Sequence, residues 1–274
     1  MVWVAGIGVL LALLYAPLLW WLGRMSVQIG QLSTGAVLVL FALVICLRDT
    51  LETLRFEPSI NNHGLGLLVL GFACLWLAGR VRFPVLPLVV LSFCFSFAAI
   101  ISFLFGKLGV RQFLPALGAI LVFGLLVGLF PALDWPLRTL AGRHAGSVLA
   151  WLGMPVELGL VPGRPAELLL TVKGRTFVVA TECNGFGLLT SSLLLATILA
   201  FQFRLPWERK FGLLAVAVPV AIVCNFLRIV SICLVAPRTN LPYGFVHEAL
   251  GLVAYFFALG LIWLAAGRSE QRKL

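Results

Sequence analysis

The chain has 274 residues, of which 62% are hydrophobic and 11% are charged, and its formal net charge is +10. Soluble domains contain about 25% charged residues, so this chain has too few charges to cover a soluble globule of its size. The composition excludes a disordered chain and argues against a soluble enzyme or a nucleic-acid-binding protein. The six cysteines form no Cys-x-x-Cys pair and no metal-ligand spacing, so we expect no metal site and no cofactor.

Apolar segments near the roughly 20-residue length that crosses a bilayer recur along the whole chain. They predict an all-α polytopic membrane protein with about eight transmembrane helices, of which the second and third are short. The expected spans are residues 2–22, 32–47, 65–79, 85–105, 113–133, 184–203, 211–236 and 245–266.

Residues 134–181 form the one long connection, before the sixth span. Its second part, residues 167–181, is rich in β-branched residues and predicts a β-hairpin with strands at 168–172 and 176–180. The chain should therefore comprise an N-terminal five-span region (1–133), a loop region (134–181) and a C-terminal three-span region (182–274). The first part, residues 135–160, predicts an interfacial amphipathic helix with Leu137, Leu140, Val148, Leu149 and Leu152 opposite Arg138, Arg143 and His144.

The Lys and Arg residues in the short loops predict the orientation of the chain, because cytoplasmic loops carry the excess of basic residues. With the N-terminus inside, the cytoplasmic segments hold ten of these residues and the short external loops hold four. We therefore expect a multi-pass protein of the cytoplasmic (inner) membrane with both termini in the cytoplasm. The 134–181 connection then lies on the external, periplasmic face.

Arg228 lies within the predicted span 211–236. A charged residue at the centre of a span costs at least about 2.5–3.5 kcal/mol on insertion scales, so such residues usually serve a function. Arg228 is about two turns from the external end, so its side chain can extend toward that face. The alternative is a structural arginine that binds carbonyl groups or the carboxylates of the hairpin.

Cys183 lies where the predicted hairpin leads into the sixth span. The partial positive charge at a helix N-terminus favours a thiolate. Asn184, Gly185 and Gly187 follow, and their N–H groups could hold an oxyanion while the small residues let a peptide backbone approach. Cys224, one helical turn before Arg228, is the rival nucleophile.

His247 begins the eighth span and should also lie at the external face. Cys183, Arg228 and His247 therefore come from three successive spans and can converge at one membrane depth. A thiol needs a base to become a strong nucleophile, and histidine is the usual partner. Arginine could stabilise the thiolate, a tetrahedral oxyanion or a substrate carboxylate.

The C-terminal part of the chain, roughly residues 172–263, resembles the exosortase/archaeosortase family of polytopic membrane proteins. The resemblance is carried by Glu182-Cys183-Asn184-Gly185, by Asn225-Phe226-Leu227-Arg228-Ile229 and by His247. It implies that Cys183 is the nucleophile, Arg228 the electrostatic stabiliser and His247 the acid/base. Together with the position of Asn184 and Gly185 at the start of the sixth span, these motifs make Asn184, Gly185 and Asn225 the candidate substrate-binding or oxyanion residues.

Membership of this family would imply a cysteine protease or transpeptidase active on the external face. Its substrates would be exported proteins that end in a short motif, a transmembrane helix and a basic tail. A thioester acyl-enzyme would pass the cleaved protein to an unidentified acceptor, such as a lipid or a polysaccharide, or to water. The alternatives are a transporter or an envelope-assembly subunit, in which Arg228 binds an anion or a partner without catalysis, and a membrane thiol oxidoreductase.

Overall fold

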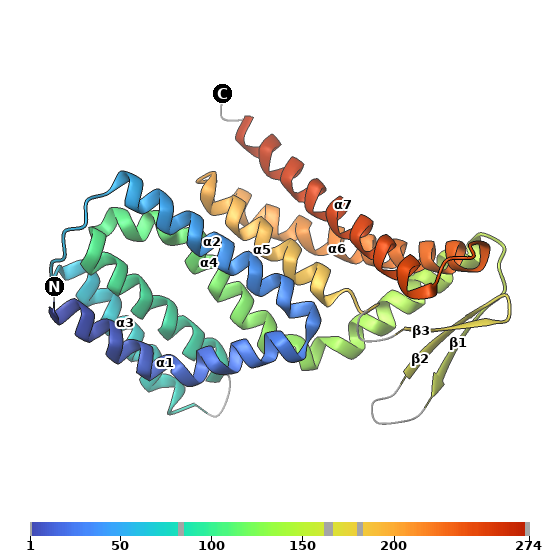
Figure 1. The fold of residues 1–274 in the computed structure, drawn as a ribbon, viewed down its shortest axis with the longest axis horizontal. Coiled ribbons are helices and arrows are strands. Elements are labelled where there is room, and N and C mark those ends of the chain that lie inside the picture. The colour runs from blue at the N-terminus through green and yellow to red at the C-terminus, as the bar shows by residue number, and fades with distance from the viewer. Residues whose placement is uncertain (1, 82–84, 162–166, 180–182, 272–274) are drawn as a thin grey trace. The chain divides into compact units, whose positions relative to one another are not determined.

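A computed structural model of the chain describes residues 2–81, 85–161, 167–179 and 183–271 (Figure 1). This part is helical apart from one small antiparallel sheet. In chain order it contains α1 (Val2–Gln28), α2 (Gly30–Thr53), α3 (Asn62–Ala78), α4 (Val85–Trp151), β1 (Val156–Val161), β2 (Glu167–Val172), β3 (Arg175–Val179), α5 (Phe186–Gln202), α6 (Trp207–Val235), the short 3-10 helix η2 (Ala236–Arg238) and α7 (Tyr243–Gln271).

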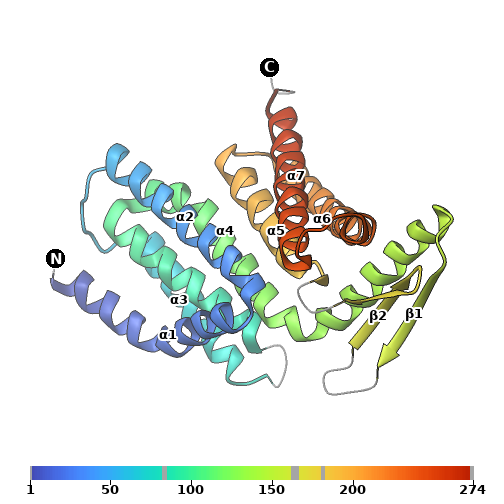
Figure 2. The same ribbon diagram turned by 45° about the vertical axis from the view of Figure 1, so that its right-hand side comes forward.

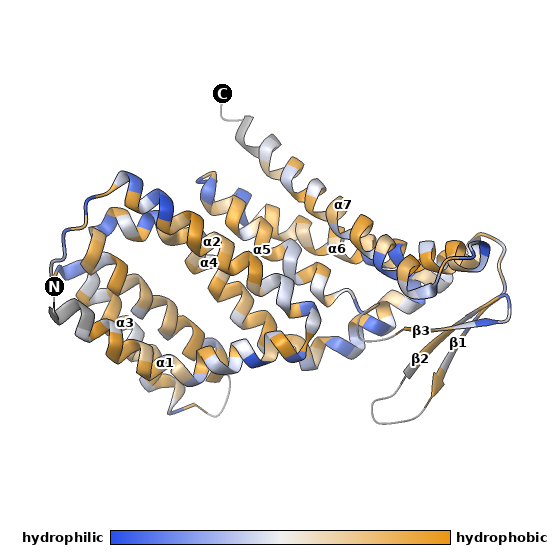
Figure 3. Ribbon diagram, in the orientation of Figure 1, coloured by the Kyte–Doolittle hydropathy of each residue, from blue (hydrophilic) through white to orange (hydrophobic). Residues whose placement is uncertain are grey.

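The helices confirm a multi-pass, all-α membrane protein, but they do not support a count of eight spans. Five helical segments of the described part are long and apolar enough to cross a membrane, whereas α3 and α5, with 17 residues each, are shorter. Figure 3 shows that apolar residues predominate along these helices, with polar residues concentrated near their ends and in the later part of α4. Many of their large apolar side chains are exposed, among them Phe256 and Trp263 of α7, as expected where lipid replaces water.

The predicted fourth and fifth spans both lie within the 67-residue helix α4. The chain interrupts its helical conformation there at Gly106, with φ 69° and ψ −168°, a region of backbone conformation essentially restricted to glycine. The helix after Gly106 continues past residue 133 to Trp151, so the expected fifth span and the expected amphipathic helix are one continuous segment.

The described residues pack as two compact units. The first comprises Met1–Gly128 and Thr197–Leu205, and so contains α1, α2, α3, the first part of α4 and the end of α5. A buried polar network joins its helices: the Tyr15 hydroxyl of α1 contacts Ser96 Oγ of α4 at 3.0 Å, and the Ser92 hydroxyl donates to the Gly71 carbonyl of α3 at 2.6 Å. Such hydrogen bonds pair polar groups that would find no hydrogen-bond partner in the lipid.

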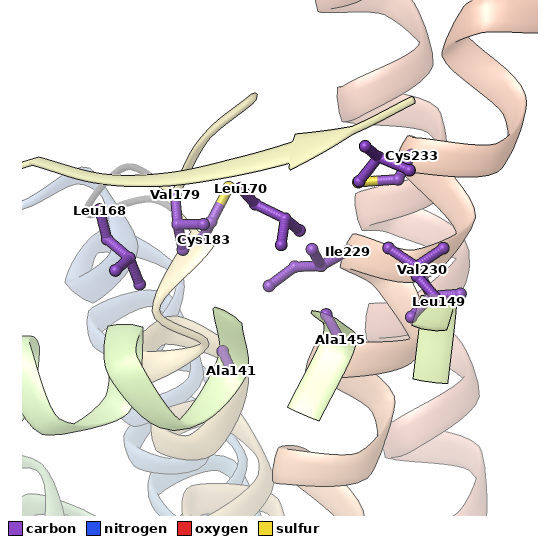
Figure 4. Packing of buried hydrophobic residues seen from close by; sticks show 11 residues of the cluster. Ala141, Ala145, Leu149, Leu168, Leu170, Val179, Cys183, Ile229, Val230 and Cys233 are labelled. Carbon is purple, nitrogen blue, oxygen red and sulfur yellow. The ribbon is translucent and has the colours of Figure 1, made fainter. Parts of the chain in front are cut away.

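The second unit comprises Leu129–Ala196 and Pro206–Leu274. Its sheet has the order β1-β2-β3, and α6 packs against α7 (Figures 1 and 2). One face of the sheet covers a stripe of apolar side chains on α4, spaced four residues apart, and the same core includes side chains of α6 (Figure 4). This core contains Ala141, Ala145, Leu149, Leu168, Leu170, Val179, Cys183, Ile229 and Val230.

The 134–181 connection differs from the prediction in two respects. The helix ends at Trp151, and Val156–Val161 forms strand β1 where a helix was expected to reach residue 160. Gly153, with a φ of +76°, and Pro155 end the helix and favour the extended chain that follows. Arg138, expected on the polar face of an interfacial helix, is instead buried, with 6% of its surface exposed.

The predicted hairpin is present, although it is part of a three-stranded sheet. Strands β2 and β3 pair through the turn at Lys173 and Gly174, both of which have positive φ. The last predicted strand residue, 180, lies outside the described residues, and the division of the chain at residues 133 and 181 stays a prediction.

Candidate active site

Cys183 lies in the turn that leads into α5, three residues before the helix begins at Phe186. The Asn184 side chain forms this turn, because its Oδ1 accepts a hydrogen bond from the Phe186 N–H at 2.7 Å. Gly185 has a φ of +79°, which favours glycine, and its carbonyl accepts from the Leu189 N–H at 2.9 Å. The local sequence therefore fixes the position of Cys183; Glu182, just before it, lies outside the described residues.

The cysteine, the histidine and the arginine predicted from the sequence come together in the second unit. Cys183 Sγ lies 3.3 Å from Nε2 of His247, in the second turn of α7. The same Nε2 lies 3.2 Å from Nη2 of Arg228, on α6. A guanidinium group only donates hydrogen bonds, so Nε2 acts as the acceptor in this arrangement, and a neutral imidazole carries its proton on Nδ1.

Arg228 reaches His247 because α7 leaves room for it. A Cβ atom placed on Gly251 would lie 3.2 Å from Nη2 and 3.3 Å from Nε of Arg228. Gly251 is one helical turn beyond His247, so the guanidinium lies against the backbone of α7 directly beside the imidazole. The position of this arginine thus depends on a small residue that the sequence alone did not single out.

Asn225 holds the Cys183 turn from α6. Its Nδ2 donates to the Cys183 carbonyl at 3.0 Å, and the residue is 3% exposed. A Cβ atom on Gly185 would lie 2.6 Å from Cγ and Nδ2 of Asn225. In this structure the side chains of Asn184 and Asn225 bind the backbone around the cysteine, and their role toward a substrate or an oxyanion stays a prediction.

Gly185→Ala is therefore expected to destabilise the protein by more than the strain of its backbone conformation alone. A left-handed conformation costs a non-glycine residue about 1–2 kcal/mol, and here the added methyl group must also displace Asn225. Gly153→Ala is the matched control, because its φ is +76° and no atom lies within 4 Å of the added Cβ. Thermal unfolding of both variants in detergent measures the difference; equal losses would contradict a tight contact between Gly185 and Asn225.

Asp134 and Arg138 support the cysteine turn from α4, and sequence analysis did not identify this role. Both oxygens of the Asp134 carboxylate accept from Arg138, with the Oδ1 bond to Nε at 3.0 Å. Oδ1 also accepts from Asn184 Nδ2 at 2.6 Å. The only available signal was an Asp–Arg pair at i and i+4, a spacing that places the two side chains side by side on a helix.

A cavity of about 870 Å³ opens beside the cysteine and the histidine. It is lined on one side by residues 175–178 of β3 and on the other by the η2–α7 connection and the start of α7. Tyr243 spans part of it, with its ring centroid 6.4 Å from that of Phe177 and 5.9 Å from that of His247. The volume lies within the range of sites that bind organic ligands.

The rival nucleophile Cys224 and the other two histidines of the chain, His63 and His144, lie elsewhere. Cys224 is 3% exposed within an apolar cluster that includes Leu188 and Ala258, and it does not line the cavity beside His247. His63 contacts Ser102 in the first unit, and Nδ1 of His144 contacts the Leu140 carbonyl on α4. The geometry therefore provides one thiol that has an adjacent base and access to a cavity, and the base in turn contacts a cation.

A family model described as transmembrane exosortase matches residues 27–264. The chain belongs to this family. The match extends the resemblance, which the motifs placed at residues 172–263, to the helices that precede them, from residue 27 onward. No curated protein and no solved structure matches the chain.

Proposed function

We propose that this exosortase-family protein is a membrane-embedded cysteine protease or transpeptidase that processes the C-terminal sorting signals of exported proteins. The observation that carries the proposal is the 3.3 Å separation of Cys183 Sγ from His247 Nε2 at the wall of the cavity. A nucleophile within hydrogen-bond reach of a base is the arrangement that covalent catalysis requires.

In the acylation step, His247 Nε2 accepts the thiol proton as Cys183 Sγ attacks the carbonyl carbon of the scissile peptide bond. Once Nε2 is protonated, it can no longer accept the hydrogen bond that Arg228 donates to it in the resting protein. The guanidinium must therefore turn away from Nε2. In this proposal its N–H groups then bind the oxyanion of the tetrahedral intermediate. When the C–N bond breaks, the leaving amine takes the proton from His247, and the protein remains bound to Cys183 as a thioester.

In the second step, an acceptor nucleophile enters the cavity and His247 removes its proton. The nucleophile attacks the thioester carbonyl, and the Cys183 thiolate leaves and recovers its proton from the imidazolium. An amine or hydroxyl acceptor gives transpeptidation, whereas water gives hydrolysis. Both outcomes use the same residues, so the acceptor decides between them.

The positions of the three residues along their helices support a site at one face of the membrane. Cys183 precedes α5, Arg228 lies two turns before the C-terminal end of α6, and His247 lies at the start of α7. The basic residues Arg204, Arg209 and Lys210 lie at the opposite ends of α5 and α6. By the preference of basic residues for the cytoplasm, we infer that the site faces outward and that α7 ends in the cytoplasm, whereas a cytoplasmic N-terminus stays a prediction from the loop charges.

Arg228 could instead bind an anion or a partner in a transporter or an envelope-assembly subunit. Arg228 contacts His247, and among the described cysteines only Cys183 lines the cavity together with this histidine. This arrangement favours the catalytic interpretation over a non-catalytic anion site.

Trapping of the acyl-enzyme tests the proposal. The protein is co-expressed with an exported protein from the same genome that ends in a short motif, one membrane helix and a basic tail. We expect a hydroxylamine-sensitive adduct on Cys183, and loss of both adduct and processing in Cys183→Ala. Cys224→Ala, another buried cysteine of the same unit, should retain both. Processing that persists in Cys183→Ala, or an adduct on Cys224, would overturn the assignment.

A further inference from the structure

The strand β3 lies at the edge of the sheet, and this edge opens on the cavity that holds the cysteine and the histidine. In the described part of the chain, β3 pairs with β2 alone, because the sheet order is β1-β2-β3. Four consecutive β3 residues, 175–178, line the same cavity as Cys183 and His247. An unpaired strand edge presents main-chain donors and acceptors that another extended chain can bind.

The register of the hairpin determines which main-chain groups face the cavity side. The two-residue turn at Lys173 and Gly174 has φ values of 50° and 76°, as in a type I′ turn. The flanking pair Val172–Arg175 is then hydrogen-bonded, and so is every second pair after it. The N–H and C=O groups of the intervening residues, Thr176 and Val178, therefore point away from β2.

The side chains agree with this register. Thr176 lies opposite Thr171, and their hydroxyl oxygens are 3.0 Å apart, as expected for the closer spacing of a non-hydrogen-bonded pair. Thr176 and Val178 thus each offer one main-chain N–H donor and one C=O acceptor along the same edge. The two residues lie two positions, or about 6.8 Å, apart along the strand. This is the spacing that an added antiparallel or parallel strand requires.

The geometry points to one occupant of this edge, the extended segment of the protein substrate that carries the scissile bond. This segment binds as a fourth strand beside β3, through main-chain hydrogen bonds to Thr176 and Val178. The inference rests on the proposed function and adds the mode of substrate recognition. Its basis is the continuity of the edge with the Cys183–His247 pair in one cavity, so a strand held there has its carbonyl groups within the space that the sulfur faces.

Binding through main-chain groups makes affinity depend on the extended shape of the peptide more than on most of its side chains. Specificity then comes from the opposite wall, where Leu241 and Tyr243 are apolar contacts and Glu248 is a charged one. Phe177 and Tyr243 lie ring to ring and connect the strand side of the cavity to α7.

The first test changes the strand. Val178→Pro removes the outward N–H at an edge position that tolerates proline, whereas the control Val178→Ala keeps it. One lost hydrogen bond should raise KM about five- to tenfold for a synthetic peptide that copies the segment before the membrane helix of the processed protein. Val178→Ala should change KM less than about twofold by the same reasoning, because the N–H remains. Alkylation of Cys183 by iodoacetamide should be the same in both variants, which shows that the nucleophile is intact.

The second test changes only the peptide and does not depend on the folding of a variant. N-methyl groups are placed on its amides one at a time. We expect weakened processing at every second amide, where the methyl group blocks the contact with β3, and little effect at the amides between them. If the peptide is processed but the N-methyl effects do not alternate along it, the inference is overturned while the proposed function stands, whatever the KM of Val178→Pro. A peptide that is never processed by the wild-type protein would overturn the proposed function as well. A dimer that Val178→Pro converts to a monomer would assign the edge to a second copy and also overturn it.

Discussion

His247→Ala is expected to slow thioester formation by about 10²–10⁴-fold, the usual contribution of a general acid–base residue. Nε2 of this histidine is 3.3 Å from the sulfur that must lose its proton, and no other histidine of the described chain lines the cavity. The variant keeps Cys183 and Arg228, so binding of the substrate should change little, and the loss should appear in kcat.

His144→Ala is the matched control. His144 belongs to the same unit but is exposed on α4, with Nδ1 bound to the Leu140 carbonyl. Its removal should leave the rate within about twofold, because surface substitutions away from the site usually have small effects. Equal losses in the two variants would show that His247 acts through folding and not through proton transfer.

Asp134→Asn and Asn184→Asp should each be harmful alone and should compensate each other in combination. The first leaves the buried Arg138 without its carboxylate, and breaking a buried ion pair typically costs about 3–5 kcal/mol. The second places two carboxylates against each other where Asn184 now donates to Asp134. In the double variant, the amide introduced at position 134 can donate to the new carboxylate at position 184 and accept from Arg138. That carboxylate can still accept from the Phe186 N–H.

Unfolding free energies and the alkylation rate of Cys183 measure this exchange. We expect the double variant to recover at least half of the stability lost by the worse single variant, a coupling of about 1–3 kcal/mol. Recovery of the Cys183 alkylation rate in parallel would show that Asp134 positions the nucleophile through Asn184. Losses that simply add would contradict the coupling, and recovered stability without recovered reactivity would limit Asp134 to a structural role.

The sequence predicted the meeting of Cys183, Arg228 and His247 because membrane depth is a strong constraint. Three residues at matching ends of successive helices have few alternative arrangements once each helix crosses the same bilayer. The network around Asp134 was not predictable in this way. Its contact with Asn184 joins residues 50 positions apart, and helix periodicity carries no information about such a pair.

The errors in the fold have local causes. Strand β1 follows the amphipathic helix after only four residues, and Gly153 and Pro155 are the only sequence signals that separate the two elements. The count of eight spans is not supported, because the predicted fourth and fifth spans lie within the one helix α4, which is interrupted at Gly106, and because α3 and α5 have only 17 residues. Arg138 was placed on a polar face because its partner Asp134 lay just outside the predicted helix.

The most direct test of the account is the rate at which iodoacetamide alkylates Cys183 in the purified protein near neutral pH, resolved by mass spectrometry for each cysteine. Thiolates react and thiols do not, so a cysteine activated by its neighbours reacts faster. The account predicts that Cys183 reacts faster than the buried Cys224, that His247→Ala slows it about tenfold or more through loss of the paired base, and that His144→Ala leaves it unchanged. A Cys183 rate that is the same with and without the His247 imidazole would contradict the central claim that this pair forms the nucleophile.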